Sequence, residues 1–267
     1  MKNNPLITIY ITNHNYGKYL EQSINSALVQ TYKNIEVIIV DDASRDESKK
    51  ILKKYKNKKK IKIILNKSQK GLVKSSIIAI KKSKGSYILR LDADDYLKKN
   101  AIEKMFNAIR KKKNVGLIFC DFNYVNNKSN LISRFKYKHK KKYSISDYPA
   151  HGACSLINKK NYLKVGGYNK LFDRQDGFYI WLLMLLKKYT ILHYKKPLFY
   201  YRKHGKNLSL DFEKILQTKL KILSFFLKKK RFYNLDLLRL KSIIANKINN
   251  LTLQNNKNYK VKLSSYQ

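Results

Sequence analysis

The stretch Gly85-Ser-Tyr-Ile-Leu-Arg-Leu-Asp92-Ala-Asp94-Asp95 ends an apolar run with three carboxylates within four residues. Residues 87–91 favour a buried β-strand that begins just after a glycine. A strand of an open α/β sheet presents the residues at its carboxyl end to the ligand-binding edge. Because the chain has only 17 acidic residues against 59 Lys and Arg, three adjacent acids predict a cation that offsets their repulsion. Hard oxygen ligands of this kind suit Mg²⁺ or Mn²⁺.

The same three acids also fit a solvated turn ahead of a helix. Asp is a favoured N-cap residue, and residues 98–112 have a helical pattern. A cluster of three acids is a weak motif by itself, so both interpretations stand at this point.

Strand and helix patterns alternate through the first 95 residues. The expected strands are residues 6–12, 35–40, 61–65 and 87–91, and the expected helices are residues 19–30, 46–56 and 72–82. This alternation predicts a mostly parallel sheet with helices on its faces, because right-handed crossovers place them there. The carboxyl ends of such strands share one edge, where Thr12, Asp42, Asn66 and residues 92–95 would converge. We therefore expect a nucleotide pocket at that edge.

The pattern after residue 112 is less regular. The expected strands are residues 115–120, 151–157, 190–194 and 197–201, and the expected helices are residues 159–165 and 176–186. Residues 126–147 are rich in Lys without a clear period, and we interpret them as a mobile loop. From Asp211 to about Leu253 the pattern is helical, with apolar residues on one face and Lys on the other.

Length and composition restrict the class of protein. A chain of 267 residues that is 43% hydrophobic can bury a large core, as one domain or two closely packed halves. The net charge of +42 would suit nucleic acid or an anionic membrane surface, but the Lys residues are spread along the whole chain. Cys120 and Cys154 lack metal-ligand spacing, so we expect buried thiols in a reducing compartment.

We expect a cytoplasmic protein. Residues 1–5 lead directly into a strand, which is unlike a signal peptide. The longest apolar run, Phe178 to Leu186, is less than half of the ~20 residues that a membrane-spanning helix needs.

Taken together, the chain resembles the family-2 glycosyltransferases, which are inverting, nucleotide-sugar-dependent enzymes with the GT-A fold. The matching segments occur in the family's order, so the joint match is more specific than any single motif. The resemblance covers roughly the first 210 residues. The segments are Ile7–Tyr16, Val40–Ser44, Gly85–Asp95, Val165–Tyr168, Gln175–Leu182 and Tyr201–His204.

The resemblance implies an α/β GT-A (Rossmann-like) fold with a mostly parallel central sheet and a helical C-terminal extension. Residues 1–112 would bind the nucleotide-sugar, residues 113–210 would form the acceptor-binding, catalytic-base half of the same domain, and residues 211–267 would be the extension. The implied reaction moves a sugar from a nucleotide-diphosphate sugar, with uridine favoured, to a hydroxyl group. The acceptor would be a glycan or lipid-linked molecule in bacterial cell-surface polysaccharide synthesis.

The resemblance also implies roles for the acids of the donor site. Asp42 would accept a hydrogen bond from the uracil ring. Asp94 matches the metal-ligating acid of the family's DxD motif, Asp92 would contact the ribose or a metal-bound water, and Asp95 would support the metal indirectly. The implied donor-binding set is Thr12, Asn15, Asp42, Asp92, Ala93 and Asp94, and the implied ligands of a divalent cation (Mn²⁺ or Mg²⁺) are Asp92, Asp94 and His204.

Asp176 matches the family's general base, which lies just before an aromatic-rich helix. The attacking hydroxyl must lose its proton as it displaces the diphosphate, so one base within hydrogen-bond reach is required. Gln175 stands where the family often has a Glu, so a second carboxylate is missing. Helix capping remains an alternative role for Asp41, Asp42 and Asp176, and for His204 the alternative is an ordinary surface histidine.

Two other classes of protein compete with this interpretation. The net charge and 21 Tyr would suit a nucleic-acid-binding protein, which would not explain acids at the strand ends. A sugar nucleotidylyltransferase also uses metal-binding acids on an α/β sheet, but the chain has no Gly-rich phosphate loop near its first strand. The basic residues 212–253 suggest either peripheral contact with anionic lipid or packing against the catalytic domain or a partner subunit.

Overall fold

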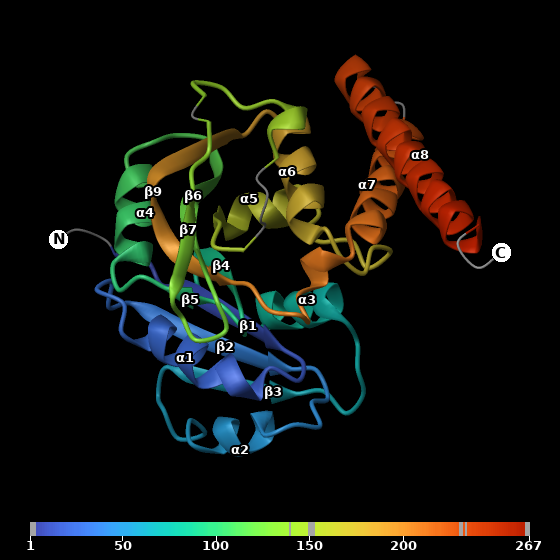
Figure 1. Ribbon diagram of the computed structural model, residues 1–267. Helices are drawn as coiled ribbons and strands as arrows, with labels where there is room; N and C mark the ends of the chain where they lie inside the picture. Colours follow the sequence, from blue (N-terminus) through green and yellow to red (C-terminus); the bar gives the residue numbers. More distant parts are fainter. Residues whose placement is uncertain (1–3, 139, 149–152, 230–231, 233, 265–267) are drawn as a thin grey trace. The chain divides into compact units, whose positions relative to one another are not determined.

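The computed structural model describes residues 4–138, 140–148, 153–229, 232 and 234–264. Contacts divide the chain into two compact units, Met1–Tyr143 with Pro149–His204 and Ser144–Tyr148 with Gly205–Gln267. The first unit contains all the described strands, which form one sheet (Figure 1). The second unit is helical.

Four parallel strands from the first hundred residues form one part of the sheet. They are β1 (Ile7–Asn13), β2 (Ile35–Asp41), β3 (Ile61–Leu65) and β4 (Tyr87–Asp92), in the order β3-β2-β1-β4. The connecting helices are α1 (Gly17–Leu28), α2 (Ser48–Lys53) and α3 (Leu72–Lys82). This alternation agrees with the prediction from the sequence, and each strand begins and ends within one residue of its predicted bounds.

The rest of the sheet is mixed in direction. After β5 (Tyr96–Leu97) and α4 (Ala101–Ile109), the chain forms β6 (Val115–Val125), β7 (Leu131–Phe135), β8 (Leu156–Asn158), α5 (Lys159–Lys164), α6 (Asp176–Leu186) and β9 (Thr190–Arg202). Strand β8 lies antiparallel between β4 and β6, whereas β6 and β9 pair in parallel. The parallel character predicted for the whole sheet therefore holds for its first half, and the complete sheet is mixed.

Several sequence-based boundaries were wrong. Residues 126–147 are not simply a loop, because they include β7, which pairs antiparallel with β6, and the short 3-10 helix η1 (Ile145–Asp147). The two short strands predicted at 190–194 and 197–201 form one strand, β9, whose pairing with β6 shifts register around Cys120 and Asp121. The predicted strand at residues 151–157 begins only at Leu156, and its residues 151 and 152 lie outside the described ones.

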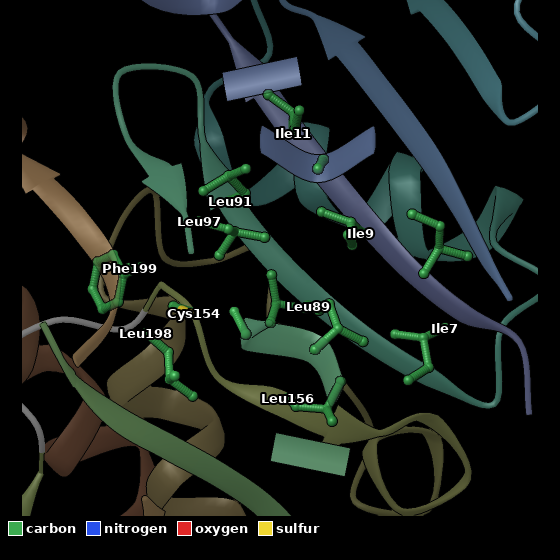
Figure 2. Close-up of a cluster of buried hydrophobic side chains, with 14 of the residues drawn as sticks. Ile7, Ile9, Ile11, Leu89, Leu91, Leu97, Cys154, Leu156, Leu198 and Phe199 are labelled. Atoms are coloured by element: carbon green, nitrogen blue, oxygen red, sulfur yellow. The ribbon is translucent and has the colours of Figure 1, made fainter. Parts of the chain in front are cut away.

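The core of the first unit lies where β1 and β4 are covered by helices and by the returning chain. Ile9 and Leu89 are fully buried side chains of neighbouring strands, and Figure 2 shows them packed with Leu156, Leu198 and other apolar side chains. Because parallel strands are covered on both faces, they are apolar almost throughout instead of alternating. Each fully buried side chain of this size contributes roughly 1.5–3 kcal/mol of hydrophobic stabilisation.

Both cysteines are buried, as the sequence predicted. Cys120 of β6 and Cys154 are 3% and 0% exposed, and their Sγ atoms lie 3.8 Å apart as free thiols. Burial raises the pKa of the Cys154 thiol well above its usual value.

The second unit consists of η1, the short 3-10 helix η2 (Leu208–Leu210), α7 (Phe212–Leu227) and α8 (Leu235–Ser264). Asp211 caps α7, because its side chain accepts a hydrogen bond from the Lys214 amide at 3.1 Å. The buried face of α7 includes Ile222 and Phe226, and Leu237 is a buried side chain near the start of α8. Among the described residues, none of the helices combines the length and apolar character that crossing a membrane requires.

Candidate active site

The residues that the strand pattern predicted at the carboxyl edge of the parallel strands lie at that edge. Thr12 of β1 is in register with Val40 of β2 on one side and with Asp92 of β4 on the other. The chain leaves β4 through Ala93, which is 1% exposed, and turns back with a hydrogen bond from the Asp95 amide to the Asp92 carbonyl at 3.1 Å. The acids of residues 92–95 therefore lie at the end of β4.

Two of these acids, Asp94 and Asp95, are buried and Asp92 is half-buried, at a high electrostatic cost. Asp94 and Asp95 are 8% and 1% exposed. Burial raises the pKa of Asp92 to about 6, against the lowering effect of Arg90 and with the repulsion of Asp94 added. The pKa of Asp95 is also raised well above its usual value, by burial first and then by the charges of Asp94 and Asp92. The cluster therefore resists full ionisation even beside the guanidinium groups of Arg90 and Arg202.

Arg202, the last residue of β9, fixes the backbone of the acidic turn. Its Nε atom donates to the Asp94 carbonyl at 2.8 Å, and its amide donates to Asp95 Oδ1 at 2.9 Å. The guanidinium also donates to the Asn126 carbonyl at 3.0 Å and to Gln22 Oε1 at 2.5 Å. A residue 1% exposed with this many acceptors holds the turn in place.

His204 lies directly beside the acidic turn. Its Nε2 atom is 2.9 Å from Asp94 Oδ2, and the centroids of the Tyr16 and Tyr19 rings lie 5.5 and 5.4 Å from that of its imidazole ring. The side chain is only 8% exposed. His204 is therefore no ordinary surface histidine.

The side chains around the acidic turn suit a hard divalent cation as ligands. Among the residues that the structure describes, no three His, Cys, Asp or Glu side chains already stand together as a metal site. Asp94 and His204 nevertheless offer an oxygen and a nitrogen side by side, and Asp95 Oδ2 is buried with no hydrogen-bond partner in the described part of the chain. Mg²⁺ and Mn²⁺ sites commonly use few protein ligands and complete their shell with water and phosphate oxygens. The residues present fit that pattern.

Asp42 holds the loop between β3 and α3. Its carboxylate accepts hydrogen bonds from Asn66 Nδ2 at 2.7 Å, from the Lys70 amide at 2.9 Å and from the Gly71 amide at 2.7 Å. Asn66, which follows β3, thus meets Asp42 at the sheet edge, as the strand pattern predicted. A carboxylate has about four lone-pair positions, so three donors leave room for one more.

Asn15 belongs to a small polar network after β1. Its backbone has φ 59°, its amide donates to Ser44 Oγ at 2.9 Å, and its side-chain oxygen accepts from the Arg45 amide at 2.8 Å. Asp41 completes this network by accepting from Asn13 Nδ2 at 2.7 Å and from Ser44 Oγ at 2.6 Å. The network joins the ends of β1 and β2.

Helix capping does not explain these acids. The N-cap residues of α2, α4 and α6 are Glu47, Asn100 and Gln175. The carboxylates of Asp41, Asp42 and Asp176 bond to other groups instead. The capping alternatives that the sequence left open are therefore wrong.

Asp176, the first residue of α6, lies close to the acids of β4. Its Oδ2 atom is 2.5 Å from Arg90 Nη1, and Arg90 Nε is 3.0 Å from Asp92 Oδ1. One guanidinium thus joins the proposed base to the proposed donor site. Arg90 was missed at the level of sequence, although a charged residue inside the apolar run 87–91 was the available signal.

Comparison with known proteins identifies the family of the chain. The model of the Glycosyl transferase family 2 matches residues 8–166. An uncharacterized glycosyltransferase of Rickettsia prowazekii (strain Madrid E) is 32% identical over 186 residues, which are 66% of this chain and 58% of the relative. The chain therefore spans little more than half of that relative's length.

Two solved structures share the fold. S. aureus TarS 1–349 in complex with UDP-GlcNAc has a TM-score of 0.69 at 18% identity, over 84% of this chain and 67% of that one. Mannosyltransferase PcManGT from Pyrobaculum calidifontis, in complex with GDP-Man and Mn²⁺, has a TM-score of 0.69 at 12% identity, over 92% of this chain and 70% of that one. The expected GT-A type of fold is thereby confirmed. With more than half of its residues matched by the family model, the chain belongs to glycosyl transferase family 2.

Proposed function

We propose that the protein transfers a sugar from a nucleotide-diphosphate sugar to an acceptor hydroxyl, with inversion, in a single displacement. The observation that carries the proposal is the position of Asp176, which shares Arg90 with Asp92. A base for the acceptor and a cluster of acids for a metal-chelated donor are thus available side by side. Membership of the family and the nucleotide sugars bound by the two structural neighbours support this choice.

Asp94 and His204, with Asp92, would hold a divalent cation between them. When bound, such a cation offsets the charge that develops on the departing diphosphate. The Mn²⁺ in the complex of the P. calidifontis mannosyltransferase supports this choice of cofactor. Arg202 keeps the acidic turn in one conformation, so no reorganisation is needed during the reaction.

The nucleotide would lie over the ends of β1 and β2. Asp42 has an acceptor position left for a ring N–H, as in uracil, and Thr12 and Asn15 stand on the same edge. Ala93 lets the backbone between the two acids pass without a bulky side chain. The UDP-GlcNAc complex of TarS supports uridine as the base of the donor.

Asp176 would accept the proton of the attacking hydroxyl. Its carboxylate is buried at the start of α6. The reaction requires a base within hydrogen-bond reach of the acceptor hydroxyl. No covalent intermediate with the protein is needed, because base and leaving group act on opposite faces of the same anomeric carbon.

A panel of nucleotides tests the proposal directly. We expect UDP with Mn²⁺ to raise the melting temperature of the full chain more than UDP or Mn²⁺ alone, because a ligand that binds only the folded state stabilises it. GDP, TDP and CDP are the matched comparisons. Hydrolysis of UDP-sugars is then measured by release of UDP. Absence of both a nucleotide-dependent shift and any turnover would refute the proposal.

For the acceptor, we propose a glycan or lipid-linked molecule of cell-surface polysaccharide synthesis, reached from the cytoplasmic face of a membrane. The charge of the chain supports attraction to anionic lipid. Lys228 and Lys229 directly follow α7, so Lys228→Gln with Lys229→Gln should reduce flotation with vesicles that contain anionic phosphatidylglycerol. The same change at Lys111 and Lys112 is the control. Equal recovery of wild type and the first variant would refute membrane contact at the end of α7.

A further inference from the structure

Arg90 is a buried charge that the family assignment leaves without a role. It lies on β4 beside Tyr10 of β1, and it is 8% exposed. Burial acts to lower the pKa of Arg90, but Asp176 and then Asp92 act to raise it, and the net shift is upward. Burying a guanidinium is costly unless its partners are well placed. The fold therefore keeps Arg90 for those two partners.

The two contacts of Arg90 differ in kind. Nη1 makes a hydrogen bond to Asp176 Oδ2 at 2.5 Å. Nε lies 3.0 Å from Asp92 Oδ1, but within the described residues it makes no hydrogen bond, so this contact is an ion pair only. Arg90 therefore holds Asp176 more firmly than it holds Asp92.

The carboxylate of Asp176 is held by one oxygen. Oδ2 is engaged by Arg90, while Oδ1 accepts no hydrogen bond from any residue in the described part of the chain. A planar guanidinium fixes the direction of a carboxylate far better than an ammonium does. Arg90 thus determines where Oδ1 points, and Oδ1 is the oxygen left to take a proton.

We propose that Arg90 is the positioning residue of the reaction, aligning Asp176 with the acceptor and setting its distance from the donor acid Asp92. The inference rests on the proposed function, because it assigns Asp176 the role of base. It predicts that the charge of Arg90 alone is insufficient and that its forked shape is required. A misplacement of about 1 Å at such a site can lower the rate about 100-fold.

Arg90→Lys is the first test, because it keeps the charge and loses the fork. We expect kcat to fall about 10- to 100-fold, with KM for the donor and Kd for UDP in Mn²⁺ changed by less than about 3-fold. Arg110→Lys, at the exposed arginine that directly follows α4, is the matched control and should leave kcat unchanged.

A second variant separates positioning from folding. In Arg90→Ala, added methylguanidine at low millimolar concentration should restore part of kcat, whereas methylammonium should not. Restoration by a soluble guanidinium is a response that a merely structural arginine would not show. The melting temperature and UDP binding of both variants are measured in parallel.

Three results would overturn the inference. They are wild-type kcat in Arg90→Lys, equal losses of kcat and UDP affinity in that variant, and no response of Arg90→Ala to methylguanidine. The proposed function fails in a different way, through a wild-type chain that neither binds UDP nor turns over any nucleotide sugar.

Discussion

At the scale of single residues, the site is defined by acidic side chains whose ionisation depends on the charged groups around them. Asp95 is 1% exposed, with one oxygen bound to the Arg202 amide and the other without a hydrogen-bond partner among the residues described. Asp92 and Asp95 both have raised pKa values, first through burial. Such a cluster lowers the stability of the metal-free protein and favours binding of a cation.

Asp176→Asn tests the base. Asparagine can still accept the hydrogen bond from Arg90 through its side-chain oxygen, but it cannot take up a proton. We expect kcat to fall at least about 100-fold, the usual contribution of general-base catalysis, while Kd for UDP in Mn²⁺ stays within about 3-fold. Steady-state kinetics and calorimetric titration measure the two quantities.

The control for this change is Asp173→Asn, which removes the same charge from an exposed position three residues earlier. It should leave both quantities unchanged. Full activity of Asp176→Asn would remove Asp176 from the role of base.

Asp94→Ala tests the metal site. Loss of a ligand should weaken binding of UDP in Mn²⁺ by about 10-fold or more, while binding of UDP without metal changes little. The melting temperature of the metal-free variant should not fall by more than a few degrees, because one of three repelling charges is removed. Unchanged affinity in Mn²⁺ would show that Asp94 does not ligate the cation.

At the scale of elements, the segment that leads into β4 has no room for a side chain at Gly85. A Cβ atom on Gly85 would lie 2.5 Å from Thr8 Oγ1, 2.6 Å from the Thr8 backbone nitrogen and 2.8 Å from the Tyr87 carbonyl oxygen. The Gly85 amide also donates to Thr8 Oγ1 at 3.0 Å. Glycine is therefore needed where the strand with the acids enters the sheet beside β1.

Gly85→Ala should consequently destabilise the protein. Two of the clashing atoms belong to the backbone and cannot move aside, and overpacking of this kind costs roughly 1–3 kcal/mol. In a protein of this size, that corresponds to a decrease of about 2–12 °C in melting temperature. Gly205→Ala is the control, because its Cβ would meet no atom within 4 Å. Equal melting temperatures for the two variants would contradict the close packing of β1 and β4.

At the scale of the whole molecule, the charge and the chemistry point to different ligands. The net charge of +42 attracts nucleic acid without specificity, whereas the acids at the strand ends would repel phosphate in the absence of a metal. Binding of nucleic acid and binding of a metal-bound nucleotide differ in their dependence on salt.

Binding of a DNA duplex should therefore be lost steeply between about 50 and 200 mM salt, by about 10³-fold or more if many phosphates are neutralised. Binding of UDP in Mn²⁺ should weaken far less over the same range, because it depends on metal coordination. Fluorescence anisotropy with labelled DNA and with a labelled nucleotide compares the two. DNA binding that persists at the upper end of that range would favour a nucleic-acid-binding function.

The sequence by itself determined the first half of the fold and the edge of the sheet at which the predicted donor-site residues lie. The strands β1 to β4 are mostly apolar, the helices between them have their own period, and both signals are local. The acids at the ends of β2 and β4 lie at the same edge of the sheet because parallel strands end there, with β1 between them. For the same reason the strand pattern alone was sufficient to place Thr12, Asp42 and Asp92 at one edge of the sheet.

Only the tertiary structure decided how the second half closes the site. Strand β8 inserts antiparallel between β4 and β6, β9 pairs with β6 through register shifts, and Arg90 reaches Asp176 across 86 residues of chain. These contacts join segments whose local patterns carry no information about their partners. A buried arginine acquires its role from the two carboxylates that folding brings to it, which is why its function depends on packing and not on the motif that contains it.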